Sequence, residues 1–200
     1  MKKFLALIVF VYFLIGSAEA AEKRYSTECK VFFMEEIDHE NMKLLLRDVA
    51  QTTACEENSQ PLPELIIQSG GGTVETAILV YGEIKDTVCT TVQQSASSAA
   101  VLLVLSGKKG CRKMHRDGFL MFHQITFPGE EEIRPGTEVE ASGLSVEETG
   151  VKKRVIERYA SIVSTNSALT PAQVKEFMQK VTFISAQDAK KYGLIDIIFE

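Results

Sequence analysis

Apolar positions along the chain alternate between the spacing typical of strands and the spacing typical of helices. An apolar stretch at 28–38 predicts a strand, and helical spacing follows over 39–54. A polar loop at 55–64, which contains prolines, leads to a short apolar strand at 65–68. The next segment carries apolar residues at helical spacing on one side: Val74, Ala77, Ile78, Tyr81 and Ile84. The first half of the chain therefore predicts two strand–helix units.

The middle of the chain continues this order. A strand at 87–94 runs into an uncharged, buried helix at 96–107, and two further strands are predicted at 111–115 and 119–124, with a tight turn at 116–118. Alternation of strand and helix predicts a parallel sheet with right-handed crossovers. The fold class expected from this pattern is α/β.

The last third of the chain changes character before the pattern resumes. Residues 126–150 are rich in glutamate, glycine and proline and predict a solvated loop. Helical spacing returns over 151–167, and a second helix is predicted at 172–180. Its start carries an N-capping sequence: Thr170, Pro171 and Gln173. A short capped helix, a glycine stop and a last strand complete the prediction.

The first twenty residues have the features of an export signal. Lys2 and Lys3 precede an apolar core at 4–15, and a small-x-small site ends at Ala20. The alternative is an uncleaved membrane anchor, but the apolar core is short for a membrane span. We expect cleavage after Ala20, a mature domain at 21–200, and a periplasmic or secreted location.

Composition and charge limit the classes of partner. Hydrophobic residues make up 45% and charged residues 24% of the chain, which is ordinary for one globular domain. Removal of residues 1–20 leaves 20 basic and 26 acidic residues, a net charge of −6. This balance argues against nucleic acid, which binds clustered Lys and Arg. The basic run at 108–116 lacks interleaved aromatic residues and reads as a strand with one solvated face.

Four cysteines in an exported chain predict disulfides. Three pairings are possible, and we favour Cys29–Cys55 and Cys89–Cys111, which join neighbours in sequence. The spacing does not support zinc binding, because no CxxC pair is present. We expect no metal and no cofactor.

Three features carry candidate chemistry. Three glycines at 70–72 follow a strand and could aim backbone N–H groups at developing negative charge, or could serve only as a strand-to-helix turn. Serines at 95–98 lie where a strand meets a buried helix, as a nucleophile would, although small residues also suit close packing there. His123 leaves the end of a strand and could act as the base, although a lone histidine is often structural.

The order and spacing of these features resemble the ClpP-like serine peptidases. Where that family has Ser-Pro-Gly-Gly-Ser-Val, residues 69–74 read Ser-Gly-Gly-Gly-Thr-Val. Where its nucleophile lies in Gly-Gln-Ala-Ala-Ser-Met-Gly-Ala, residues 93–100 read Gln-Gln-Ser-Ala-Ser-Ser-Ala-Ala. The family's Met-Ile-His-Gln matches 121–124, and its closing Phe-Leu-Ser-Ala and Tyr-Gly-Leu-Val-Asp match 183–186 and 192–196. The resemblance spans most of residues 25–200.

The resemblance implies both a fold and roles for four residues. The fold is a ClpP/crotonase-like spiral of repeated β-β-α units with a protruding handle helix, the handle region lying at about 126–180. Ser97 would be the nucleophile and His123 the general base, and the amides of Gly71 and Ser98 would form the oxyanion hole. Family members are homo-oligomeric rings, so the resemblance implies a ring here too.

The sequence departs from the family at the third catalytic residue. The position of the family's Asp is Val181, which cannot orient an imidazole or stabilise imidazolium. Asp188 and Gln179 are near in sequence but do not align. The exported signal peptide peptidase A group shares the fold and uses a Ser–Lys pair. Lys85 and Lys108 are candidates for the lysine of such a pair, although neither aligns with it.

Two functions follow from the sequence. The first is an exported, ATP-independent serine endopeptidase acting on peptides or unfolded proteins, without an ATP-driven unfoldase, because no ATP pool exists outside the cytoplasm. The alternative is a catalytically impaired ClpP-fold pseudoenzyme that acts as a binding or assembly module. A crotonase-type acyl-CoA enzyme would share the fold, but no adenine pocket is indicated.

Overall fold

The computed structural model describes residues 26–27, 29–52, 62–126 and 146–200. Its strands are β1 (Ser26–Thr27), β2 (Lys30–Phe33), β3 (Glu64–Ser69), β4 (Cys89–Ser97), β5 (Arg112–His115), β6 (Phe119–Phe122), β7 (Thr182–Ser185) and β8 (Ile197–Phe199). Its helices are α2 (His39–Gln51), α3 (Val74–Ile84), α4 (Ala100–Ser106), α5 (Val146–Thr165), α6 (Pro171–Gln179) and α7 (Ala186–Lys191).

The strands form one mixed sheet that is parallel through its centre. The order is β1-β2-β3-β4-β5-β8, and the pairs from β2 through β5 to β8 are all parallel. Strand β4 also pairs in parallel with β6, which in turn pairs antiparallel with β7. The prediction of an α/β fold around a parallel sheet is therefore confirmed, and the order agrees with a ClpP-like fold.

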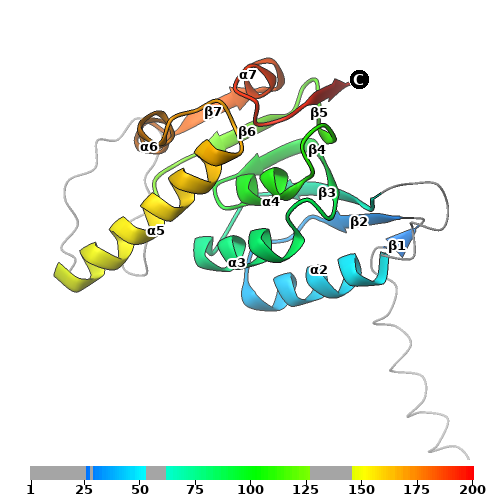
Figure 1. Cartoon of the computed structure of the whole chain (residues 1–200), viewed down its shortest axis with the longest axis horizontal. Helices are drawn as coiled ribbons and strands as arrows, with labels where there is room; N and C mark the ends of the chain where they lie inside the picture. The colour runs from blue at the N-terminus through cyan, green and yellow to red at the C-terminus, as the bar shows by residue number, and fades with distance from the viewer. Residues whose placement is uncertain (1–25, 28, 53–61, 127–145) are drawn as a thin grey trace, which may run out of the picture.

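Three helices cover one side of the sheet, and a fourth projects from it. Helices α2, α3 and α4 follow one another along one side of the strands in Figure 1, and α3 contacts both α2 and α4. Helix α4 is buried at every position, as its uncharged sequence predicts. Helix α5 crosses beside α3 and α4, and its N-terminal end extends away from the sheet in Figure 1.

The boundary between β4 and α4 differs from the sequence prediction. The pattern predicts a strand ending at residue 94 and a helix from residue 96, whereas β4 continues to Ser97 and α4 begins at Ala100. Residues 95–97 pair with Phe119, Leu120 and Met121 of β6, and this pairing extends the strand. Ser98 then adopts a φ of +54°, which a helix does not tolerate.

The predicted N-terminal cap of α6 is present, whereas the start of α5 differs from the prediction. The Thr170 hydroxyl accepts from the Gln173 N–H (3.3 Å), and the Gln173 side-chain oxygen accepts from the Thr170 N–H (2.9 Å), which confirms the capping box. Helix α5 begins at Val146, five residues before the predicted start and inside the acidic stretch. The rest of that stretch, 127–145, lies outside the described residues.

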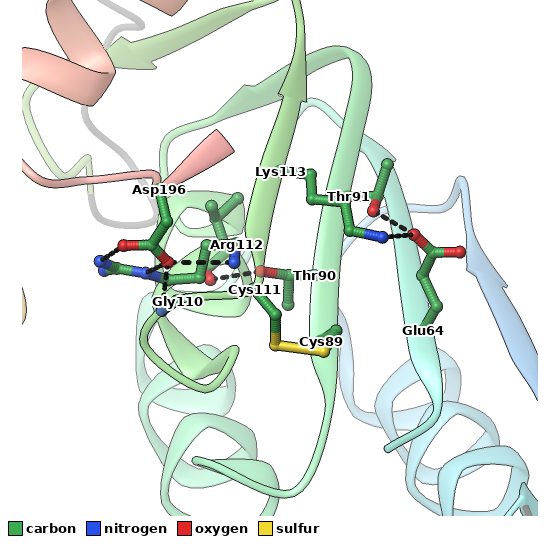
Figure 2. The surroundings of a disulfide bond; sticks show 10 residues. Glu64, Cys89, Thr90, Thr91, Gly110, Cys111, Arg112, Lys113 and Asp196 are labelled. Atoms are coloured by element: carbon green, nitrogen blue, oxygen red, sulfur yellow. Dashed lines mark hydrogen bonds and ion pairs between the residues drawn. A yellow bond between two sulfur atoms is a disulfide. The ribbon is translucent and has the colours of Figure 1, made fainter. Parts of the chain in front are cut away.

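One predicted disulfide is present and fastens β4 to the loop before β5. Cys89 and Cys111 are bonded, and Figure 2 shows them beside a polar cluster of the sheet. Glu64 on β3 accepts from the Thr91 hydroxyl (2.6 Å) and from Lys113 Nζ (3.0 Å). Burial alone would raise the pKa of Glu64, but these hydrogen bonds and the nearby lysine charges hold it below its ordinary value.

Two other sequence predictions fall partly or wholly outside the described residues. Cys29 is disulfide-bonded, and its predicted partner Cys55 lies outside them. The predicted signal peptide at 1–20 also lies outside them. Among the helices of the described ranges, none is both long enough and apolar enough to cross a bilayer.

Candidate active site

The register between β4 and β6 brings Ser97 and His123 to one face of neighbouring strand ends. Ser97 is the last residue of β4 and pairs with Met121 of β6. His123 follows β6 directly, two residues beyond Met121, so alternation puts Met121 and His123 on the same face. Ser97 and His123 therefore lie at the ends of two paired strands, where a serine–imidazole contact can form.

The glycine turn after β3 packs directly on this serine. Gly71 has a φ of +105°, and a Cβ added there would lie 2.7 Å from the Ser97 carbonyl oxygen and 2.7 Å from Ser98 Cβ. The Gly71 carbonyl accepts from the Ile37 N–H (2.7 Å), which fixes the turn against the chain leaving β2. A side chain at position 71 would thus displace the Ser97 backbone, so the site needs glycine here.

Ser98 is held on both sides in a strained backbone conformation. Its N–H donates to the Met121 carbonyl oxygen (2.7 Å), and its own carbonyl oxygen accepts from the Tyr159 hydroxyl (3.0 Å). Positive φ is uncommon for serine and costs about 1–2 kcal/mol. The turn at 97–99 is therefore fixed by β6 on one side and by α5 on the other.

The two predicted oxyanion donors lie side by side, and each N–H has a partner inside the protein. The Ser98 N–H is bonded to Met121, as described, and the Gly71 N–H donates to the Ser69 hydroxyl (3.2 Å). The longer Gly71 bond is readily exchanged for a substrate oxygen, whereas the short Ser98 bond belongs to the β4–β6 ladder. In this conformation, an oxyanion at Ser98 requires that ladder bond to break.

Val181, which the sequence aligns with the family's catalytic Asp, lies just beyond the end of the β6–β7 ladder. The antiparallel ladder of β6 and β7 ends with the pair Phe122–Thr182, and His123 and Val181 are the next residues beyond it on the two strands. Val181 has a φ of +47°, an outlier for a β-branched residue and a conformation that Asp and Asn adopt more readily. The backbone at this position suits a carboxylate, and the side chain does not supply one.

The structure separates the other candidate acids and bases from the site. Asp188 lies in the first turn of α7, where its side chain accepts from the hydroxyl of the N-cap Ser185 (2.8 Å), and Ser185 pairs with Phe119, at the end of β6 remote from His123. Lys108 lies at the opposite end of β4, where its N–H donates to the Val88 carbonyl. Lys85 lies at that end too, next to Asp86, whose N–H donates to the Ser106 carbonyl. Eight strand steps, about 26 Å, separate that end from Ser97, so neither lysine serves as its base.

The face that carries Ser97 has exposed aromatic surface at its edge. Phe183 is 58% exposed and contacts Phe119 edge-on, with ring centroids 5.5 Å apart. The alternation of β6 and β7 puts both rings on the same face as Met121 and Ser97. The opposite face is buried against α4 and α7, whereas Ser97 itself is only 6% exposed.

The sequence did not indicate two contacts that shape this site. Tyr159 fits the apolar spacing of its helix, which by itself indicates a core position, yet its hydroxyl donates to the Ser98 carbonyl oxygen. Met121 lies in the segment 121–124, which the sequence singled out only for His123. Nothing in that segment indicated that the Met121 carbonyl accepts from the Ser98 N–H. A buried tyrosine generally finds a hydrogen-bond partner, and this was the one available signal.

A serine and a histidine at the ends of adjacent strands, beside a glycine turn in an α/β domain, are a combination that serine peptidases use. The family model described as Clp protease matches residues 17–200, so the chain belongs to the Clp protease family. A curated relative, an ATP-dependent Clp protease proteolytic subunit from Chlorella vulgaris, is 29% identical over 176 residues. That alignment covers 86% of this chain and 82% of the relative.

Proposed function

We propose that the protein is an exported, ATP-independent serine endopeptidase of the ClpP-like family. The observation that carries this proposal is the β4–β6 register, which sets Ser97 and His123 on one face while Gly71 packs on the serine. Ser97 attacks the scissile carbonyl carbon and His123 takes its proton, then returns it to the leaving amine. Water hydrolyses the resulting acyl-enzyme.

The oxyanion hole in this proposal consists of the Gly71 and Ser98 N–H groups. Substrate binding must then exchange the Ser69 hydroxyl and the Met121 carbonyl for the substrate oxygen. The substrates are peptides or unfolded proteins in the periplasm or outside the cell.

Two further parts of the proposed function are assembly into a ring and export from the cytoplasm. ClpP family members form oligomeric rings, and a homo-oligomeric ring with α5 at the subunit contact is proposed here. Export rests on the N-terminal segment, with its two lysines, apolar core and cleavage site after Ala20. Without an ATP pool at that location, no ATP-driven partner is needed.

A second function is favoured by two specific observations. Val181 removes the orienting carboxylate, and the Ser98 N–H is engaged by Met121. Both are expected of a pseudoenzyme that keeps the fold as a binding or assembly module. A Ser–His pair retains part of the catalytic rate without its acid, and the presence of both residues favours the peptidase.

The deciding experiment is labelling of the mature protein, of known oligomeric mass, with a fluorophosphonate, followed by peptide mapping. The peptidase predicts a label on Ser97 that disappears in His123→Ala. Ser95→Ala is the matched control, since Ser95 lies two residues earlier on the same strand and face. Folded, oligomeric protein that takes no label would establish the pseudoenzyme instead.

A further inference from the structure

The hydroxyl of Tyr159 joins helix α5 to the turn that carries Ser97. Tyr159 lies in the second half of α5 and is only 2% exposed. Its hydroxyl donates to the Ser98 carbonyl oxygen at 3.0 Å. Tyr159 has no role in the chemistry of a serine–histidine–acid triad.

The surroundings of Tyr159 fix the direction of its hydroxyl. The ring meets the buried Phe122 ring edge-on, with centroids 6.4 Å apart and planes at 83°. Phe122 is the β6 residue between Met121 and His123, so the phenol packs on the strand that carries the candidate base. Burial raises the pKa of Tyr159, and its hydroxyl stays a proton donor at any pH at which a peptidase works.

The bond from Tyr159 holds a peptide group that has little other support. The Ser98 carbonyl also accepts from the Val101 N–H, but at 3.2 Å. Ser98 has positive φ and relaxes to an ordinary conformation if its neighbouring peptide groups are released. Because Ser97 directly precedes it, any such relaxation moves the Ser97 hydroxyl relative to His123.

We propose that Tyr159 is a positioning residue for Ser97: its hydroxyl holds the Ser98 carbonyl and so fixes the backbone where β4 passes into α4. The inference rests on the proposed function, in which Ser97 is the nucleophile. It makes the placement of α5, the helix that projects from the sheet, a determinant of the reactivity of Ser97.

The test compares Tyr159→Phe with a matched control, Tyr81→Phe. Tyr81 on α3 is also buried, 8% exposed, and its hydroxyl accepts from Asn166 Nδ2 (2.8 Å), at the C-terminal end of α5. Each variant loses one buried hydrogen bond and keeps its ring. Only Tyr159→Phe releases the turn at 97–99.

We expect Tyr159→Phe to lower the maximal rate of fluorophosphonate labelling at Ser97 by about tenfold or more, because small misplacements of reacting groups cost this much. The half-saturating reagent concentration should stay within about twofold of the parent value, because the hydroxyl does not touch the reagent. Tyr81→Phe should label at the parent rate, and the two unfolding temperatures should fall alike. A parental rate in Tyr159→Phe, or an equal loss in Tyr81→Phe, overturns the inference.

Hydrogen exchange of the backbone separates this inference from the proposed function. If the parent protein takes no label, the proposed function fails, and exchange at residues 97–101 still decides whether Tyr159 holds the turn. Faster exchange in Tyr159→Phe than in Tyr81→Phe supports that role. Equal exchange in the two variants refutes it.

Discussion

Val181 combines an unfavourable backbone conformation with an unsuitable side chain at one position of the site. Its φ of +47° crowds the branched Cβ, at a cost of about 1–2 kcal/mol. It directly precedes β7, next to the end of the β6–β7 ladder that His123 follows, and in the proposed function a carboxylate here would bond the imidazole. One substitution at this position can therefore test a cost in stability and a proposed cost in rate together.

Substitution of Val181 by Asp should raise the labelling rate of Ser97 by about tenfold or more, because a carboxylate that bonds His123 fixes its tautomer and stabilises imidazolium. The same substitution should raise the free energy of unfolding by about 1 kcal/mol, since Asp tolerates positive φ. Labelling kinetics and urea denaturation measure the two effects.

Val181→Asn is the matched control for the carboxylate. Asn also tolerates positive φ, so the gain in stability should match that of Val181→Asp, while the labelling rate should stay near the parent value. Equal rates in the two variants would mean that the group assisting His123 lies elsewhere.

At the scale of elements, the sequence predicted the order of strands and helices better than their ends. Apolar spacing identified α2, α3 and α4 because each buries one face or all of its surface. It could not show that residues 95–97 join the sheet, because their partners lie on β6, more than twenty residues later. The αL conformation of Ser98, which separates strand from helix, follows from that long-range pairing.

The candidate site likewise has residues that the sequence could predict and contacts that it could not. Ser97, Gly71 and His123 could be predicted because short motifs carry them and the motifs match a known family. The Tyr159 bond and the partner of the Ser98 N–H could not, since both depend on how α5 and β6 dock against the turn. Contacts between segments that are far apart in the chain produce no local residue pattern from which they could be predicted.

Helix α6 delivers the chain to Val181, and its N-terminal cap can be tested alone. Thr170→Ala should lower the free energy of unfolding by about 1 kcal/mol, because the Gln173 N–H loses its acceptor. The control is Thr165→Ala, at an exposed residue whose hydroxyl bonds only the Ser161 carbonyl within α5. An equal change in the two denaturation curves would show that the capping box contributes little.

At the scale of the whole molecule, a buried ion pair joins the C-terminal segment to the sheet. Arg112 on β5 is 1% exposed, and its guanidinium bonds both Asp196 carboxylate oxygens (2.9 and 2.7 Å), as Figure 2 shows. It also donates to the Asn166 carbonyl (2.9 Å), and Asn166 bonds Tyr81. The basic run predicted a strand with one solvated face and did not reveal that Arg112 is buried.

This ion pair gives the fold a defined response to acid. Burial alone would raise the pKa of Asp196, but hydrogen bonds from Arg112 and from the Arg112 and Gly110 N–H groups lower it below its ordinary value. A lowered folded-state pKa contributes stability that is fully present above the unfolded-state pKa, near 4, and is lost as pH falls through the folded-state pKa. The parent should therefore lose stability as the pH falls below about 4.

Asp196→Asn should remove this part of the pH dependence and lower stability at neutral pH by about 3 kcal/mol, since Arg112 keeps a buried charge without its counterion. Asp117→Asn is the control, because the Asp117 side chain is 80% exposed and its loss should leave the acid response close to that of the parent. Urea denaturation at pH 7 and at steps below pH 4 measures both. If Asp196→Asn retains the full acid sensitivity of the parent, carboxylates other than Asp196 govern acid unfolding.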